Sequence, residues 1–477
     1  MNPYIFVPVT LSLLSAFVAV NWIYFKILKI AFNKNLVDNP NARKLQKTPV
    51  PVMGGIAVFF GVLVGVMVGA LLHALVCDPS TTSLLPVICS MSVMLYVGAM
   101  DDILGLTPKS RLIIEILTML ALIYSSGSCL DTFRGMWGVY KFSWWLAVPL
   151  TVFAGVGIIN AVNMIDGVNG LSSGLCMTCS LFFGAAFVKV GDIPNAVLAF
   201  TTFGALSPFF IHNVFGFRSR MFIGDAGTMV MGVLLTWFTI SLLGTESSIE
   251  YFSRASNVNA IALAVAVLSV PIFDTLRVMG MRIAHKKSPF HPDKTHLHHV
   301  FINVGVSHFI TAMSIILIDI FIVGIWSVAV ISGASIEWQL YIVILSSFAL
   351  VWGTYFILRY HAIHHTRFLH RLTRFSVKTH LGRKEWWKKI TDMLDAPGEY
   401  EDKEEVIVKH TDEHDRKLIL DYIKGRAEVM VQDIIDNSGA EKHRVYPILS
   451  EEVIAGRVRV IKEGYWGGPE IVAFLES

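Results

Sequence analysis

The sequence predicts an all-α polytopic membrane protein with about eleven transmembrane helices, followed by a small cytoplasmic α+β domain. Of its 477 residues, 54% are hydrophobic and only 16% are charged, whereas soluble domains contain about 25% charged residues. Apolar runs of about 20 residues, long enough to cross a bilayer, recur along the chain. The net charge of +3 is small and says little about partners.

About eleven segments fit a membrane span by length and apolar composition. Two of them, about 111–126 and 144–160, are short, which leaves the count open by one. The other expected spans are about 4–30, 52–77, 84–104, 171–190, 194–213, 227–244, 258–278, 309–333 and 338–358. The N-terminus has neither a basic stretch nor a small-residue cleavage site, so the first span is expected to be retained. The five cysteines lie in or beside apolar segments, and neither a disulfide framework nor a zinc site is expected.

Basic residues are concentrated in the connections that follow the odd-numbered spans. The first of these connections has a cluster between Lys26 and Lys47, and the ninth has one between Arg282 and Lys294. The even-numbered connections hold only Arg134, Lys141, Lys189 and Arg254. Because cytoplasmic loops are enriched in Lys and Arg, the odd connections and the C-terminal tail are expected inside the cell, and the N-terminus outside.

A polar stretch, residues 160–171, separates two of the apolar segments. Polar side chains recur there at every third position: Asn160, Asn163, Asp166 and Asn169. This spacing puts them roughly on one face of a helical turn, and the glycines between them let the backbone leave the helix and approach a ligand. Such oxygen-rich groups suit Mg²⁺ and phosphate chemistry. A polar turn without a ligand is the alternative.

Carboxylates stand at the end of the third span and at the start of the eighth. Asp101 and Asp102 are adjacent charges that repel each other and are costly near hydrocarbon. They are consistent with a nearby cation or proton donor, and one of them could serve as a general base. A structural pair that caps the next turn is the alternative. Asp225, between Gly224 and Gly227, opens a helix whose N-terminus favours anions, and it serves as a ligand, as an N-cap or as both.

Cations and histidines fill two further loops. Arg43, Lys44 and Lys47 precede the entry into the second span, where phosphate binding and a purely topogenic role are equally open. The loop 288–299 contains His291, His296, His298 and His299. Their spacing does not suit zinc, whereas His and Lys supply the donors that phosphate recognition needs. All of these segments fall in odd connections, which indicates an active site at the cytoplasmic membrane face.

Six motifs occur in order at the expected span boundaries, over about residues 1–358: KTPVPVMGG, GAMDD, NAVNMIDGVNGL, FIGDAGT, PIFDTLRVMGMRI and SPFHPDKTHLHH. Together they resemble the polyprenyl-phosphate N-acetylhexosaminyl-1-phosphate transferases, the WecA/MraY-like enzymes of the glycosyltransferase family 4 type. The form of the histidine block is closer to the GlcNAc-1-phosphate branch than to the peptidoglycan translocase branch. The resemblance covers the predicted membrane domain and leaves the tail unexplained.

The resemblance implies transfer of an N-acetylhexosamine-1-phosphate, GlcNAc-1-phosphate by preference, from a UDP-sugar to undecaprenyl phosphate with release of UMP. It implies Mg²⁺ as cofactor, with Mn²⁺ as an alternative. It also implies a multi-pass protein of the bacterial inner (cytoplasmic) membrane that starts the assembly of a cell-surface polysaccharide or glycan. Attack in a single step assisted by Asp101 and a double displacement through an aspartyl-phosphate both remain open.

The resemblance also carries roles over to single residues. Asn163 and Asp225 match the metal ligands. Catalytic roles are expected for Asp101 and Asp102, which match the essential acidic pair, and for Asp166, which matches the acidic residue of the nucleotide-binding segment and could bind the nucleotide instead. Substrate-binding roles are expected for Arg43, Lys44, Lys47, Asn169, Arg282, His291, His296, His298 and His299. Two positions depart from the family pattern: Asn169 stands where many members have Asp, and Gln46 where related sequences often have His.

The chain divides into a predicted transmembrane domain (1–358), a basic juxtamembrane helix with an acidic linker (359–405) and a winged-helix-like domain (406–477). The linker is expected to begin at Asp392. In the last domain, helices are expected at about 413–424, 429–437 and 441–455, and strands at about 457–462 and 470–475. Acidic residues oppose its basic face, so protein docking is favoured over DNA recognition. Membrane lipid and a second copy of the chain are further expected partners.

Two other classes of function remain to be weighed. A transporter would place ionisable groups near the bilayer midplane on broken helices, whereas here they gather at one face. A membrane-tethered regulator would need fewer spans than this chain has. Both are less favoured than a transferase.

Overall fold

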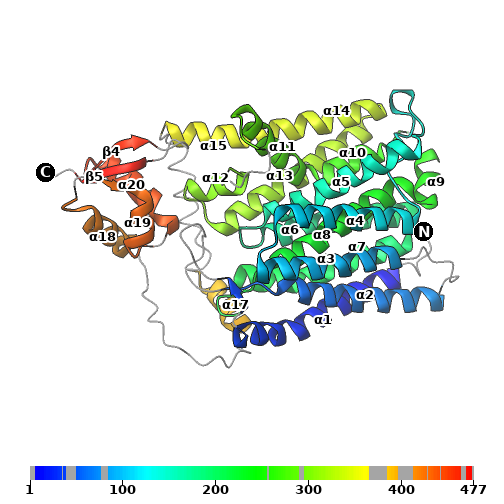
Figure 1. The fold of residues 1–477 in the computed structure, drawn as a ribbon, viewed down its shortest axis with the longest axis horizontal. Helices are drawn as coiled ribbons and strands as arrows, with labels where there is room; N and C mark the ends of the chain where they lie inside the picture. The colour runs from blue at the N-terminus through cyan, green and yellow to red at the C-terminus, as the bar shows by residue number, and fades with distance from the viewer. Residues whose placement is uncertain are drawn as a thin grey trace.

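The computed structural model describes residues 6–34, 36–38, 50–76, 84–254, 257–288, 295–364, 384–395, 412–426, 428–440, 442–463 and 469–474. In these residues the chain forms a bundle of long, roughly parallel helices and a small α/β unit beyond one end of the bundle (Figure 1). The bundle helices are α1 (Phe6–Asn33), α2 (Gly54–Val76), α3 (Leu85–Leu104), α4 (Pro108–Ser126), α5 (Trp144–Ile165), α6 (Leu171–Val190), α7 (Ile193–Phe215), α8 (Gly224–Gly244), α10 (Ala260–Val267), α11 (Ser269–Ala284), α13 (His308–Ile331), α14 (Ile336–Ser347) and α15 (Gly353–Ile363). Shorter elements are η2 (Met136–Gly138), α9 (Glu246–Arg254), α12 (Leu297–Asn303), η3 (Phe348–Trp352) and α17 (Glu385–Asp395).

The helices confirm a multi-pass membrane architecture. Within the described ranges, nine helices are long and apolar enough to cross a membrane, with α14, η3 and α15 joined as one span. The pair α10 and α11 makes a tenth candidate that is bent by 71°. The predicted segment 111–126 is helical as α4, but it is not among the nine. The exact number of spans therefore stays a prediction.

The ninth expected span, 258–278, is wrong as a continuous helix. It breaks at Leu268, and α11 then runs on to Ala284. Asp319 of α13 lies fully buried beside the break, where its Oδ1 accepts hydrogen bonds from Ser269 Oγ at 2.9 Å and from the Val270 N–H at 3.3 Å. The second bond satisfies a backbone N–H at the start of α11 that a helix end leaves without an intrahelical partner.

Helix α8 lies at the centre of the bundle and is buried along its length. Its first turn packs against the start of α2 and the end of α3, where glycines allow the backbones to come close together. A Cβ added to Gly55 would lie 2.2 Å from the Gly227 nitrogen, and one added to Gly98 would lie 2.5 Å from the Ala226 Cα. Such distances exclude any larger residue, so these glycines bring three helix ends to one place.

A short β ribbon fixes the chain that enters α2. Strands β1 (Val37–Asp38) and β2 (Val50–Pro51) pair antiparallel. The segment between them holds Arg43, Lys44 and Lys47 and lies outside the described residues. The Phe222 N–H donates to the Pro51 carbonyl at 2.7 Å, so the ribbon is joined to the loop that precedes α8.

The C-terminal unit has its own apolar core. It consists of α18 (Asp412–Ile423), β3 (Val429–Met430), α19 (Val431–Asn437), α20 (Lys442–Ile454), β4 (Val458–Glu463) and β5 (Pro469–Phe474), with strand order β3-β5-β4. Ile419, Ile434, Leu449 and Val472 lie at its centre. The order of helices and strands agrees with the predicted one apart from the added strand β3. The winged-helix assignment and the domain limits stay predictions.

The expected linker start is wrong, because residues 392–395 belong to α17.

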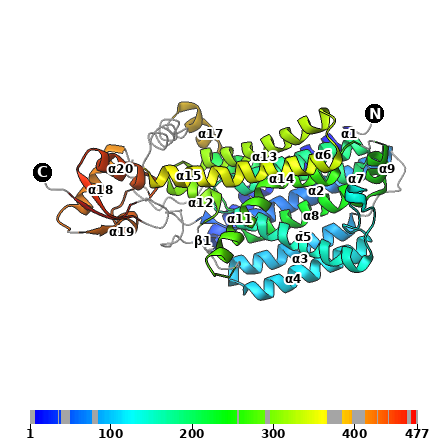
Figure 2. The ribbon, with the colours of Figure 1, turned by 90° about the horizontal axis from the view of Figure 1, so that it is seen from above.

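The two ends of the bundle differ in the elements that lie there. The N-terminus and α9 lie at one end, whereas α12, α17 and the C-terminal unit lie at the other (Figures 1 and 2).

Candidate active site

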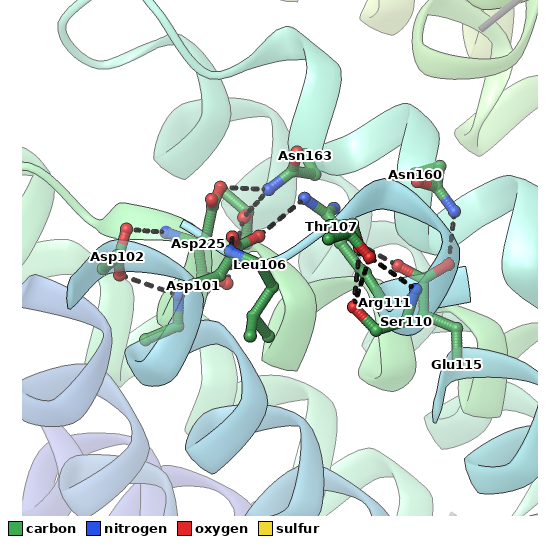
Figure 3. Close-up of polar contacts among 12 residues, drawn as sticks. Asp101, Asp102, Leu106, Thr107, Ser110, Arg111, Glu115, Asn160, Asn163 and Asp225 are labelled. Carbon is green, nitrogen blue, oxygen red and sulfur yellow. Dashed lines mark hydrogen bonds and ion pairs between the residues drawn. The ribbon is translucent and has the colours of Figure 1, made fainter. Parts of the chain in front are cut away.

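A carboxylate and amide cluster forms where the ends of α3, α5 and α8 meet (Figure 3). Asn163 Nδ2 donates to Asp225 Oδ1 at 2.5 Å and to Thr228 Oγ1 at 2.8 Å. The carboxyl group of Asp101 lies beside that of Asp225. Two carboxylates this close repel each other unless a cation or a proton lies with them. The cluster is therefore suited to holding positive charge.

Asp102, unlike Asp101, binds backbone N–H groups at the start of α8. Its Oδ1 accepts from the Asp225 N–H at 2.9 Å and its Oδ2 from the Ala226 N–H at 3.1 Å. The anion expected at the N-terminus of α8 is thus a carboxylate of the chain itself. Gly224 has φ +70°, and a Cβ there would lie 2.5 Å from Asp102 Oδ2. Asp102 therefore holds the end of α3 against the first turn of α8, where Asp225 lies.

Arg111 of α4 connects the cluster to a second carboxylate. Its Nη1 lies 3.3 Å from Asp101 Oδ2, and its Nε donates to Glu115 Oε1 at 3.0 Å. Asn160 donates through Nδ2 to the other oxygen of Glu115. Within the described residues, Arg111 Nη2 is buried without a hydrogen-bond partner. Neither Arg111 nor Glu115 was predicted as a site residue from the sequence, although a glutamate inside an apolar segment is a signal of one.

We expect Arg111→Gln to lower the rate of the reaction catalysed at this cluster by about tenfold to a hundredfold, because the Asp101 carboxylate loses the cation that orients it. Lys109→Gln is the matched control, since Lys109 is an exposed cation in the first turn of the same helix. Steady-state turnover of both variants in detergent or liposomes measures the difference. Equal rates for the two variants would contradict a role for Arg111.

The turn after α5 carries Asp166. Ser172 Oγ donates to Asp166 Oδ1 at 2.7 Å. Burial raises the pKa of Asp166 to about 6; the Ser172 hydrogen bond opposes this rise, and repulsion by Asp225 adds to it. The expectation that the polar residues of 160–171 share one helix face is wrong. Helix α5 ends at Ile165, so only Asn160 and Asn163 lie on it. Asn160 and Asn163 then reach different carboxylates.

The turn continues through two backbone contacts to other helices. The Asn169 N–H lies 3.4 Å from His308 Nδ1. Gly170 has φ +77°, and its N–H donates to Asn213 Oδ1 at 2.6 Å. Asn213 Nδ2 in turn donates to the Met221 carbonyl at 2.8 Å, in the loop before α8. Asn213 was not expected from the sequence, yet it joins two of the predicted site segments.

A buried aspartate organises the described part of the histidine loop. Asp274 of α11 accepts from Arg277 Nη2 at 2.6 Å, from His296 Nδ1 at 2.9 Å and from the Leu297 N–H at 3.1 Å. Arg277 Nη2 also donates to the Thr295 carbonyl at 2.7 Å. Asp274 and Arg277 both belong to the PIFDTLR segment. An acid and a base three positions apart in an apolar segment were the sequence signal for this ion pair.

His298 faces the turn that holds Asp166. A Cβ added to Gly167 would lie 3.2 Å from His298 Nε2. Burial lowers the pKa of His298 well below its usual value, so the ring is neutral. Its Nε2 is buried with no hydrogen-bond partner in the part of the chain that the structure describes. The ring of His299 lies next to it, with the two centroids 4.2 Å apart.

Arg282 lies buried in the last turn of α11. Four of the predicted residues lie outside the described ranges: Arg43, Lys44, Lys47 and His291.

The oxygen donors of the cluster fit one kind of divalent-metal site. Among the described residues, no group of three or more His, Cys, Asp and Glu side chains could hold a metal by itself. Mg²⁺, however, is usually held by one or two carboxylates together with waters and substrate phosphates. Asp225, the neighbouring Asp101 and the amide of Asn163 are hard oxygen donors that fit this mode.

Comparisons with known proteins agree with this chemistry. Residues 84–243, which include the whole cluster, match the family model described as glycosyl transferase family 4. A protein of Bacillus subtilis named "Probable undecaprenyl-phosphate N-acetylglucosaminyl 1-phosphate transferase" is 30% identical over 318 residues, which cover 66% of this chain and 83% of that protein. Proteins of Yersinia pestis and Escherichia coli O157:H7 named "Undecaprenyl-phosphate alpha-N-acetylglucosaminyl 1-phosphate transferase" are each 28% identical. The match to the Yersinia pestis protein covers 59% of this chain and 73% of that protein. The match to the Escherichia coli protein covers 72% of this chain and 89% of that protein.

Proposed function

The chain belongs to glycosyl transferase family 4, and from this premise we propose that it transfers N-acetylglucosamine-1-phosphate from UDP-GlcNAc to undecaprenyl phosphate. The observation that carries the proposal is the cluster of Asp101, Asn163 and Asp225 at one end of a membrane bundle. The curated relatives carry this activity in their names. None of them is a transporter, so that alternative has no support.

In the proposed reaction an oxygen of the lipid phosphate attacks the β-phosphorus of UDP-GlcNAc. The bond from the β-phosphorus to the oxygen that bridges the two phosphates breaks, and UMP leaves with that oxygen. Because the nucleophile is already an anion, the protein mainly has to position the two phosphates and offset their charge. The product is a lipid diphosphate that carries the sugar, the starting point of a cell-surface glycan.

Asp225 and Asn163 would hold Mg²⁺, or Mn²⁺ as the alternative, with Asp101 beside them. A cation bound there offsets the charge of the diphosphate and acts as a Lewis acid on it. Asp101 is held by the Leu106 N–H at 2.7 Å and by Arg111, which orients its carboxylate for the lipid phosphate.

The other predicted residues surround this centre. Asp166, with Asn169 in the same turn, is proposed to bind the nucleotide. His298 has a buried, unpartnered Nε2 among the described atoms, which supports a contact between the histidine loop and the diphosphate or sugar. The β ribbon ends beside Phe222, three residues before Asp225, which supports binding of lipid phosphate by the basic segment 43–47.

The proposed location is the bacterial inner membrane, with the active site and the tail in the cytoplasm and the N-terminus outside. The support is the concentration of Lys and Arg in the odd connections. The separation of the N-terminus from α12 and α17 at opposite ends of the bundle agrees with this orientation (Figure 2).

The test is UMP release by the purified chain with undecaprenyl phosphate, Mg²⁺ and a panel of UDP-sugars. We expect turnover with UDP-GlcNAc and little with UDP-hexoses that lack the acetamido group. A folded chain that released no UMP from any of the sugars would overturn the proposal. The same protein incubated with UDP-sugar alone should yield no phospho-enzyme; a trapped aspartyl-phosphate would replace direct attack by double displacement.

A further inference from the structure

The juxtamembrane helix α17 ends at Asp395. Its carboxylate accepts hydrogen bonds from consecutive backbone N–H groups of the loop between α7 and α8. Asp395 accepts from the N–H of Phe217 at 3.2 Å, of Arg218 at 3.0 Å and of Ser219 at 2.9 Å. Ser219 Oγ also donates to Asp395 Oδ1 at 2.7 Å. Successive N–H groups that converge in this way form an anion-binding nest, and hydrogen bonds to an ionised acceptor are the strong ones.

The same face of α17 makes apolar contacts with the bundle. The Trp387 ring lies with its centroid 4.4 Å from that of Phe215 and 5.6 Å from that of Phe309. Thr391 Oγ1 donates to the Phe215 carbonyl at 2.8 Å. Trp387, Thr391 and Asp395 are four residues apart, so they lie on one side of the helix. The helix is thus docked along its length at the end of α7.

The nest is anchored on its inner side as well. Ser219 is buried, and its carbonyl accepts from the Tyr24 hydroxyl at 2.8 Å. Its Oγ also lies 3.2 Å from His212 Nδ1, and the ring of Tyr24 stacks on that of His212 with centroids 4.4 Å apart. The Asp395 carboxylate therefore ends a chain of contacts that reaches α1 and α7 through a single loop residue.

The loop that Asp395 holds, residues 216–223, contacts three other segments of the candidate site. Met221 binds Asn213, which also holds Gly170 in the turn after Asp166. Phe222 and Ile223 accept from the N–H groups of the first two residues of α2, at 3.0 and 2.8 Å. The loop then passes directly into the first turn of α8, where Asp225 lies.

We propose that Asp395 is a positioning residue through which the cytoplasmic tail sets the geometry of the transferase site. By holding residues 217–219, it fixes the loop that joins the start of α2, the turn after Asp166 and the first turn of α8, where Asp225 lies. The C-terminal unit follows α17 in the sequence, so a partner that binds the tail can act on this contact. The kinetic part of this inference rests on the proposed function.

The test compares Asp395→Ala and the milder Asp395→Asn with the matched control Asp392→Asn, all in the full chain. Asp392 is an exposed carboxylate on the same helix. Hydrogen exchange of the amides of residues 217–219 should accelerate in Asp395→Ala, less in Asp395→Asn, and not in the control. We expect kcat of Asp395→Ala to fall by about tenfold or more, because small misplacements of reacting groups have effects of that size. Asp395→Glu should recover part of the loss.

Two results would overturn the inference. Unchanged exchange at residues 217–219 in Asp395→Ala would show that the nest does not hold the helix. Accelerated exchange with wild-type kcat and KM would show that docking does not position the site. Failure of the unaltered chain to release UMP would contradict the proposed function instead, and the exchange data would still decide whether Asp395 holds the loop.

Discussion

Asp225→Asn should lower Mg²⁺-dependent turnover by at least about a hundredfold while the helical bundle stays folded. The substitution keeps the size of the side chain and an oxygen that can accept from Asn163 Nδ2, but it removes the negative charge that would bind the metal. The loss should appear in kcat, and raising the Mg²⁺ concentration should recover part of it. Turnover measured across a Mg²⁺ titration, together with the melting temperature in detergent, checks both halves of the expectation.

The control for this variant is Asp131→Asn, which removes a carboxylate from the loop between α4 and α5. The Asp131 carboxylate lies 3.9 Å from the exposed Lys141 Nζ, a weak ion pair, so its loss should leave turnover unchanged. Wild-type activity and Mg²⁺ dependence in Asp225→Asn would remove Asp225 from the metal site.

Asp274→Ala should lower the free energy of unfolding by about 3–5 kcal/mol, because it leaves the fully buried Arg277 guanidinium without its charge partner. It should also abolish turnover, since His296 and the Leu297 N–H lose the acceptor that holds the histidine loop. Denaturant or thermal unfolding of the purified chain measures the first effect, and UMP release measures the second.

A double replacement separates the two effects of Asp274. Asp274→Leu combined with Arg277→Met removes the buried charge pair altogether, and apolar replacements of such pairs are often neutral or stabilising. The Arg277 guanidinium packs on the Tyr355 ring at 3.8 Å, a contact that a Met side chain can partly replace. Stability should therefore recover in the double variant while activity does not. Recovery of activity as well would contradict the role of Asp274 in holding His296.

Much of the bundle could be predicted from the sequence because a helix in lipid must satisfy its backbone internally and expose apolar side chains. The apolar runs therefore marked the helices, and the order of the motifs marked the ends where Asp101, Asn163 and Asp225 meet. Neither signal depends on knowing which helices touch.

The contacts between distant segments could not be predicted in this way. Asp102 caps a helix that begins more than a hundred residues later, and Asp395 reaches a loop 176 to 178 residues earlier. The break at Leu268 depends on a buried Asp319 from another helix. In each case a polar side chain satisfies backbone N–H groups that only the folded bundle brings near, and hydrophobic periodicity carries no information about such pairs.

The central claim is that the sugar moves together with its phosphate, and the fate of a radiolabelled β-phosphate in UDP-GlcNAc tests it most directly. Attack at the β-phosphorus places this phosphate between the lipid phosphate and the sugar. With undecaprenyl phosphate, Mg²⁺ and the unaltered chain, we predict that the label enters the lipid fraction in proportion to UMP released. Label that stays in the aqueous phase as UDP while the sugar becomes lipid-linked would contradict the account.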